Sequence, residues 1–458
     1  MNIALLFLSW PLLALFAFKT QPPHRAVLLT VLGGWIFLPV GIYPSGTSSS
    51  AFPYWLVGSA VPSDMLITKA WVAPVSAVLA MVLTDLRRVL SFRFSAFDLP
   101  MLVWCLWPVF QASIATASRP DPFLASFYLI GVWGFPWLLG RLYFGHPEAR
   151  RSLVTGLAWS GLVCLPFALW EGFFAPDLYA VFYEPHPFAA DGIVRYIGWR
   201  PIGFFENGNQ YGLWVCLCAL AALWVWRSKA KSRSGAGWQW GAMLALGIAL
   251  FSQSVGAIVL LIFGWIVIEV MGRVRVQWFV VGALLFTVGF GSVYLSGLAP
   301  INHWGKETII GRKVVDSFRL AGRGSLPWRI SQDQKAIALI KPVAMFGHGQ
   351  WDWWSSLNTR PWGLALLIVG QFGIIGLLAA FGALAAPAVK TILDARAECQ
   401  WSSRSAATVI AVIVLLALMD ATLNSFFFFP SILAAAALVF PAKKTRPSTP
   451  QNMDYGST

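Results

Sequence analysis

The stretch NQYGLWVCLCALAALWVW (residues 209–226), RSKAKSR (227–233) and GWQWGAMLALGIALF (237–251) places a short cluster of positive charge between two long apolar runs. Runs of this length that lack the alternation of a strand are typical of helices that cross a membrane. Lys and Arg are enriched in the connections that stay on the cytoplasmic side, so residues 227–233 are expected to lie inside. The sequence therefore predicts an all-α polytopic membrane protein.

The composition of the whole chain supports this fold class. Of the 458 residues, 58% are hydrophobic and 11% are charged, and the mean hydropathy is +0.67. A soluble globular domain carries about 25% charged residues. The net charge of +14 is assigned mostly to cytoplasmic loops that face anionic membrane lipids. The pattern leaves no soluble basic domain, so membrane lipids are expected as partners and nucleic acid is not.

The same pattern repeats along the chain and divides it into hydrophobic segments. They fall at roughly 2–18, 26–43, 65–83, 98–114, 122–140, 151–170, 209–226, 237–251, 254–271, 276–295, 361–386, 406–420 and 425–440. Every second connection is basic, which puts the N-terminus outside and the C-terminus inside. We expect about 12–14 transmembrane helices in one domain, residues 1–440, followed by a disordered cytoplasmic tail at 441–458. Two alternatives stay open: residues 51–62 as a re-entrant piece, and 406–440 as one broken helix.

Two outer connections, 171–208 and 296–360, are long enough to carry chemistry. The second has nine Lys or Arg and four acidic residues, a positive excess on the face where basic loops are disfavoured. An anionic ligand would explain this excess, because arginine holds a pyrophosphate through forked hydrogen bonds and keeps its charge. Binding to lipid headgroups and local ion pairs are the alternatives. The candidate ligand-binding residues are Arg195, Arg200, Arg319, Arg323, Arg329 and Arg360.

Within the large loop, the sequence predicts a helix that begins near Ser325 and is stopped by Pro342. Ile337 and Ile340 fall on its apolar side, and Asp333 is placed on the polar side. We interpret this segment as an amphipathic helix that lies on the membrane surface or caps a cavity. Nearby, Trp351, Trp353 and Trp354 are interpreted as an interfacial belt, with a sugar-binding platform as the alternative.

Two residues are candidate general bases. His348 lies between Gly347 and Gly349 and has a pKa suited to proton transfer near neutral pH. Glu206, in the run FFENGN, can deprotonate a hydroxyl group. The alternative for His348 is that it is an incidental residue on a glycine turn. The alternative for Glu206 is that its run is a turn that simply opens the next helix. No metal-ligand spacing occurs, so neither a metal nor a cofactor is expected.

Few ionisable residues lie within the hydrophobic segments. Lys69 and Glu269 lie near segment ends, where their side chains are expected to reach the membrane surface. Asp420, near Asn424, is a candidate functional residue because charge within a bilayer is costly. Pairing with a loop arginine is the alternative role.

Three motifs resemble the O-antigen ligase and Wzy-type O-antigen polymerase superfamily. RPIGFFENGNQYG (200–212) is similar to the Arg-x-x-Gly-x-x-x-x-x-Asn element of that family. LPWRISQDQKAIALIKPVAMFGHG (326–349) resembles a part of its large periplasmic loop, and TRPWGLALLIVGQFGIIGLL (359–378) resembles the helix that follows. The sequence departs from the family at Val255, where ligases carry arginine, and at Asn358 and Thr359, where they carry a histidine.

The resemblance implies a C-type glycosyltransferase-like fold in the bacterial inner membrane with a periplasmic active face. It also implies an undecaprenyl-pyrophosphate-linked glycan as donor, a glycan or lipid-linked acceptor, and arginines that bind the donor pyrophosphate. The activity expected is that of a ligase or polymerase. A transporter or flippase for a lipid-linked glycan, or a structural subunit of a polysaccharide export machine, is the alternative.

Overall fold

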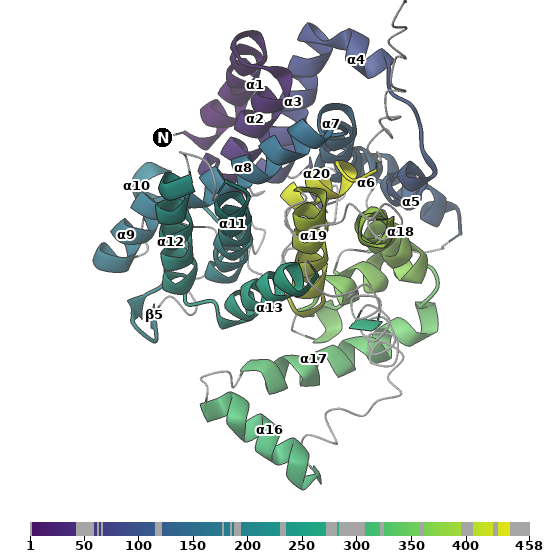
Figure 1. The fold of residues 1–458 in the computed structure, drawn as a ribbon. Helices are drawn as coiled ribbons and strands as arrows, with labels where there is room; N and C mark the ends of the chain where they lie inside the picture. The colour runs from purple at the N-terminus through teal and green to yellow at the C-terminus, as the bar shows by residue number, and fades with distance from the viewer. Residues whose placement is uncertain are drawn as a thin grey trace, which may run out of the picture.

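The structure, a computed structural model, describes residues 2–42, 59–61, 64–65, 67–114, 121–175, 178–183, 186, 194–229, 235–271, 282–283, 307–320, 325–350, 352–357, 361–394, 406–424 and 429–439. Most of this part of the chain is helical (Figure 1). Most of the predicted segment 276–295, most of the piece at 51–62 and the whole tail at 441–458 lie outside the described residues.

The N-terminal half is built from helices joined by short connections. Its helices are α1 (Ile3–Thr20), α2 (Pro23–Phe37), α3 (Lys69–Thr84), α4 (Leu86–Leu90), α5 (Leu99–Ile114), α6 (Pro122–Leu129), α7 (Phe135–Tyr143), α8 (Pro147–Val163), α9 (Leu165–Phe174) and α10 (Leu178–Phe182). A π-helical turn, Ile130–Gly134, joins α6 to α7, and a single 3-10 turn, Ala96–Asp98, precedes α5.

The second half continues the bundle and adds two helices outside it. Its helices are α11 (Gly208–Lys229), α12 (Gly235–Phe251), α13 (Val255–Met271), α16 (Ile309–Leu320), α17 (Ser325–Ile340), α18 (Leu364–Asp394), α19 (Ala406–Leu423) and α20 (Pro430–Ala436). In Figure 1, α17 lies beyond one end of the bundle and α16 lies further out. The two segments predicted at 406–420 and 425–440 correspond to the separate helices α19 and α20.

Within the described residues, the strands form three two-stranded antiparallel pairs. They are β1 (Gly41–Ile42) with β4 (Ile67–Thr68), β2 (Ser59–Val61) with β3 (Asp64–Met65), and β5 (Val194–Arg195) with β6 (Gly198–Trp199). None is longer than three residues, so the strands shape connections between helices.

Seven helical spans within the described residues are long and apolar enough to cross a membrane, and α3, α12 and α13 are shorter apolar helices. The prediction of an all-α, multi-pass membrane protein is therefore confirmed at this level. The number of 12–14 crossings stays a prediction. Helix α11 is buried along most of its length, as expected for a helix that is apolar on every side.

Arginines in three of the basic connections bind other helix ends. Three arginines from predicted cytoplasmic connections contact elements distant in the chain: Arg88 donates to Leu142 O at 3.2 Å, Arg150 donates to Ala437 O at 2.8 Å, and Arg227 pairs with Glu269 at 2.8 Å. Glu269 therefore lies at a segment end, as predicted. Each contact therefore joins a basic connection to an element that is distant in the chain.

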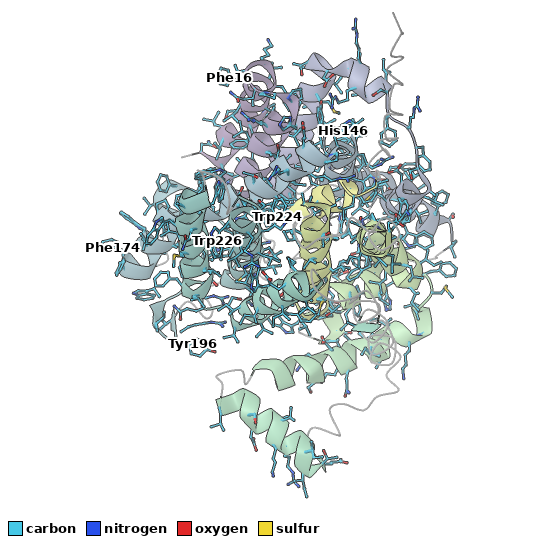
Figure 2. The ribbon with its side chains drawn as sticks, viewed as in Figure 1. Phe16, His146, Phe174, Tyr196, Trp224 and Trp226 are labelled. Carbon is cyan, nitrogen blue, oxygen red and sulfur yellow. The ribbon has the colours of Figure 1, made fainter. Side chains whose placement is uncertain are left out.

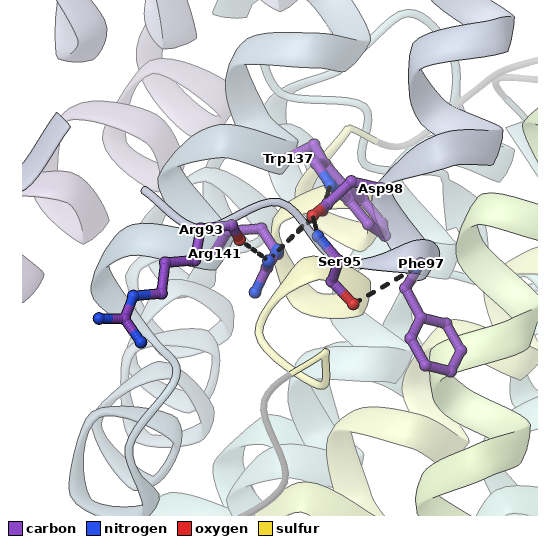
Figure 3. A network of polar contacts seen from close by, with 6 residues as sticks. All are labelled: Arg93, Ser95, Phe97, Asp98, Trp137 and Arg141. Carbon is purple, nitrogen blue, oxygen red and sulfur yellow. Dashed lines mark hydrogen bonds and ion pairs between the residues drawn. The ribbon is translucent and has the colours of Figure 1, made fainter. Parts of the chain in front are cut away.

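A buried ion pair joins α7 to the turn that precedes α5 (Figure 3). Arg141 donates from Nε to Asp98 Oδ1 at 2.7 Å and from Nη2 to Asp98 Oδ2 at 2.9 Å. The same carboxylate accepts from Trp137 Nε1 and from the backbone N–H of Ser95, each at 2.7 Å, and Arg141 also donates to Arg93 O at 2.8 Å. The network fixes the C-terminal end of α7 against the start of α5.

The other ends of the helices also meet. The backbone N–H of Val40, after α2, donates to the Tyr179 hydroxyl of α10 at 3.1 Å. At the start of α18, the N–H of Leu364 donates to Asn424 O, just after α19, at 3.0 Å. These two contacts therefore join helix ends that the sequence assigns to outer connections.

Helix α17 matches the predicted span, but the prediction that Asp333 lies on its polar side is wrong. Asp333 is buried together with Ala336, Ile337 and Ile340, so it lies on the packed side of the helix. Its carboxylate lies 3.5 Å from the backbone N–H of Trp362, which precedes α18. The spacing of three and four residues explains this placement, because positions 333, 336, 337 and 340 share one helical face.

Candidate functional site

The candidate site is built around the loop 200–209, which leads into α11. Glu171, near the end of α9, is buried and its Oε2 accepts the N–H groups of Ile202 and Gly203, each at 2.6 Å. Gly203 has φ +58, a conformation that a side chain disfavours. A carboxylate that accepts two backbone N–H groups holds the loop tightly against α9.

Arg200 is buried within this loop. Its Nη2 donates to Asn209 Oδ1 at 2.8 Å and its Nε donates to Ser252 O, after α12, at 3.1 Å. Gly208 makes room for the guanidinium, since a Cβ there would lie 2.4 Å from Arg200 Nε. Arg200, Gly208 and Asn209 therefore form one interlocked turn, whereas Gly203 of the same run is bound by Glu171.

Glu206 is buried in the same loop. Its backbone N–H donates to Gln210 Oε1 at 2.9 Å, and Gln210 Nε2 lies 3.4 Å from Glu206 Oε2. Next to it, Asn207 Oδ1 accepts the N–H groups of Asn209 and Gln210 at 2.9 and 3.0 Å. Asn207 thereby caps α11. The turn that opens the next helix, offered as the alternative reading, is present, and it holds the Glu206 carboxylate inside the protein.

The prediction that the Lys69 side chain reaches the membrane surface is wrong. Lys69 is 1% exposed, and its Nζ donates to Trp35 O at 2.9 Å and to Phe204 O at 2.8 Å. The ammonium lies 4.7 Å from the ring centroids of Trp35 and Phe205, and it interacts electrostatically with Glu206. Carbonyl groups, ring faces and a carboxylate together replace the water that the ammonium would otherwise seek.

Aromatic side chains from α10 cover the opposite side of the loop. Tyr183 donates its hydroxyl to Phe37 O, and burial raises the pKa of Tyr183 to about 12. His186 Nε2 lies 2.9 Å from Phe205 O, and its ring packs edge-on against Tyr179 with centroids 4.7 Å apart. The loop is therefore held between α9, α10 and α3.

The hairpin of β5 and β6 comes directly before Arg200 and carries Arg195, which is half-buried. Gln253, between α12 and α13, binds this hairpin on both sides: its Oε1 accepts the Ile197 N–H and its Nε2 donates to Trp199 O, both at 3.2 Å. Gln253 adopts a left-handed φ of 52° to do so. The run FSQSVGA, which departs from the family pattern at Val255, therefore supports the loop through Ser252 and Gln253.

His348 belongs to a different part of the fold, where α18 is interrupted. Gly373 has φ +74 and ψ −177, which breaks the helix. The backbone N–H of His348 donates to Gly370 O and that of Gly349 to Gln371 O, both at 2.8 Å. In return, the N–H of Ile374 donates to a carbonyl in the same loop, Ala344 O, at 2.8 Å.

The remaining carbonyl groups of this break are bound by α5. Trp107 Nε1 donates to Phe372 O at 2.7 Å, and Gln111 Nε2 donates to Gln371 O at 2.7 Å. Irregular backbone at membrane depth is stable when protein groups satisfy it in this way. The glycine turn expected around His348 is present, with φ +74 at Gly347.

The ring of His348 is also fixed. Its Nε2 lies 3.1 Å from Leu339 O, and the ring stacks on Trp353 with an interplanar angle of 2°. A carbonyl oxygen only accepts, so Nε2 is the donor in this contact, and Nδ1 is the ring nitrogen that is left to accept a proton. Trp353 and Trp354 are buried, so neither forms an interfacial belt or an open sugar-binding platform. Trp351 lies outside the described residues.

The structure thus places Arg195, Arg200 and Glu206 together and His348 in the separate α18 region. The side chains of Arg319 and Arg329, and all of Arg323 and Arg360, lie outside the described residues. Asp420 Oδ1 accepts from Asn424 Nδ2 at 2.8 Å near the C-terminal end of α19. Within the described part of the chain, no three His, Cys, Asp or Glu side chains gather as a metal site would require.

Sequence reasoning missed three residues that shape the site: Lys69, Glu171 and Gln253. For Lys69 and Glu171 a signal existed, because ionisable residues in apolar segments are functional or structural by default. Gln253 gave no comparable signal. No protein-family model matches the chain, and no curated protein matches its sequence.

Proposed function

We propose that the chain is a membrane glycosyltransferase that ligates or polymerises an undecaprenyl-pyrophosphate-linked glycan on the periplasmic face of the bacterial inner membrane. The observation that supports this most is the hydrogen bond of the buried Arg200 with Asn209, for which Gly208 leaves room. Arg200 and Asn209 belong to the first of the three motifs that resemble the O-antigen ligase and polymerase superfamily. The fold proposed is the C-type glycosyltransferase-like one.

In the proposed reaction, an acceptor hydroxyl attacks the anomeric carbon of the donor sugar, and the bond to the pyrophosphate breaks. The leaving pyrophosphate gains negative charge, which fixed guanidinium groups stabilise. Arg195, Arg200 and the loop arginines Arg319, Arg323, Arg329 and Arg360 are the candidates for this role. Arg200 is the best prepared of those described, because two hydrogen bonds hold its guanidinium in one orientation.

The acceptor proton goes to a general base, for which Glu206 and His348 remain the candidates. Lys69 stabilises the charge of the Glu206 carboxylate by an electrostatic interaction. On His348 the accepting atom would be Nδ1, because Nε2 is bound to Leu339 O. A general base contributes typically about 10²–10⁴-fold in rate. In a transfer assay, we expect Glu206→Gln or His348→Ala to lose activity by this factor; near wild-type turnover in both would rule out either residue as the base.

The function as a whole is tested in cells that lack the gene. Deletion should cause a lipid-linked glycan to accumulate, and the wild-type gene should clear it. Arg200→Ala should fail to clear it at normal protein level, and Arg200→Lys should rescue poorly because an ammonium cannot form the fork. Arg227→Ala, at the opposite end of the bundle, is the matched control and should be active. If no lipid-linked glycan accumulates in the deletion strain, the proposal is contradicted.

A second candidate function, transport of a lipid-linked glycan, is favoured by the interrupted helix α18. Transporters commonly bind their cargo at such helix breaks. Here, however, the carbonyl groups of Gly370, Gln371 and Phe372 already accept hydrogen bonds from the protein. If transport is the function, the glycan that accumulates in the deletion strain will remain on the cytoplasmic face, whereas a missing transferase leaves it on the outer face.

A further inference from the structure

The tip of the β5–β6 hairpin exposes a group of apolar and aromatic side chains next to the outer end of α9. Val194, Tyr196 and Ile197 are 62%, 55% and 66% exposed, and Trp199 is 40% exposed. Beside them, the last residues of α9 are also exposed, with Phe173 at 73%. In Figure 2, Phe174 and Tyr196 lie on the same flank of the molecule, at its edge.

The hairpin is held in place while its side chains face outward. Its backbone is bound at Ile197 and Trp199 by the amide of Gln253, and β6 lies against α9. Fixing the backbone in this way keeps the apolar side chains at the surface, where in water they would be unfavourable. A surface that is both rigid and apolar indicates a contact partner.

The position of α9 identifies the partner as the lipid bilayer. Helices α8 and α9 form one span that is apolar enough to cross a membrane. From Leu153, after the last inner arginine of α8, to Phe174 the chain rises by at most about 33 Å at about 1.5 Å per residue. This length is close to the roughly 30 Å of the hydrocarbon core, so Phe174 lies near its outer boundary. The exposed hairpin continues the lipid-facing surface of α9 at that depth.

We propose that the β5–β6 hairpin, with the end of α9, is a membrane-interface anchor inserted into the outer leaflet at the level of the headgroups. Tyr and Trp side chains are suited to this depth, because each has an apolar body and a polar group. The anchor holds the adjoining loop 200–209 near the plane of the lipid phosphates. The inference does not depend on the proposed reaction.

The experiment uses an environment-sensitive NBD fluorophore attached to single cysteines in the full-length protein, reconstituted in phosphatidylcholine and phosphatidylglycerol vesicles. Ile197→Cys reports on the hairpin, and Ser317→Cys, on the exposed polar side of α16, is the matched control. The four native cysteines within the described residues are buried, and Cys399 is replaced by Ser in both variants. A monodisperse size-exclusion profile confirms that each variant is folded.

At position 197 we expect a blue-shifted emission and strong quenching by lipids that carry a nitroxide near the headgroup. At position 317 we expect the emission of a water-exposed probe and little quenching. Equal spectra and equal quenching at both positions would overturn the anchor. So would a probe at position 197 that is water-exposed in vesicles and becomes protected only when a soluble glycan is added, since the surface would then be a sugar-binding platform.

Discussion

Replacing Lys69 by Met tests how the buried ammonium supports the loop 200–209. The substitution keeps the length of the side chain and removes two charged hydrogen bonds, to Trp35 O and Phe204 O. A hydrogen bond from a charged donor contributes about 1.5–3 kcal/mol. Removing one member of a buried charge pair costs about 3–5 kcal/mol, because the other charge loses its partner. These terms overlap, so we expect a total loss of about 3–5 kcal/mol in stability.

A double-mutant cycle separates the two contributions. Glu206→Gln removes the carboxylate charge alone, and the double variant removes both charges. If the two side chains are coupled, the double variant should be more stable than the sum of the single effects predicts, by about 1–3 kcal/mol. The thermal midpoint of unfolding in detergent, followed by size exclusion, provides the measurement. Lys313→Met, on the exposed side of α16, is the control and should leave the midpoint unchanged.

Two results would refute this reasoning. A Lys69→Met variant as stable as wild type would show that its hydrogen bonds and charge contribute nothing net, as in buried pairs that hydrophobic residues replace without loss. Strict additivity in the cycle would show that Lys69 supports the loop through the Phe204 carbonyl alone, without the Glu206 carboxylate.

Three further predictions concern the rest of the fold. Gly373→Ala should destabilise the protein by more than about 1 kcal/mol, because φ is +74 and the new Cβ would lie 2.2 Å from Met345 O. Gly382→Ala is the control: it lies in the same helix with no neighbour within 4 Å, and it should be neutral or stabilising. The thermal midpoints of the two variants are compared. Arg141→Met should lower the midpoint by an amount equivalent to about 3–5 kcal/mol, because it leaves a buried carboxylate without its cation; an unchanged midpoint would argue against a stabilising pair. A cysteine at Ser317 should react with an impermeant maleimide on intact cells and one at Ser91 should not, and equal labelling of both would contradict the topology.

Much of the fold could be predicted from the sequence, because two strong signals agree. Long apolar runs mark the helices, and clusters of Lys and Arg mark connections between them. The helix at Ser325–Ile340 was predicted at both ends, since Ser, Pro and the apolar spacing act locally. Asp333 was placed on the wrong face because its partner, the N–H of Trp362, is 29 residues away.

The site was harder to predict because its residues are joined by contacts across the bundle. Arg200 and Glu206 could be selected by residue type within one motif. Their actual environment depends on Glu171, Lys69 and Gln253, which come from three other parts of the chain. Lys69 was predicted to reach the membrane surface, a reading suited to a lysine beside lipid. In the fold, carbonyl oxygens and aromatic rings surround it instead, and sequence position alone does not reveal such an enclosure.

The interrupted helix α18 has a consequence for the biogenesis of the protein. Its carbonyl groups near Gly373 are satisfied by Gln111 and Trp107, made about 260 residues earlier, and by the turn at Gly347–Gly349. A nascent α18 entering the bilayer has none of these partners bound until it meets α5 and the returning loop. The segment from Leu364 to Phe372 therefore cannot reach its final place by partitioning into lipid alone. Its insertion must wait for the helices made before it, so the chain completes this part of its topology as a tertiary event.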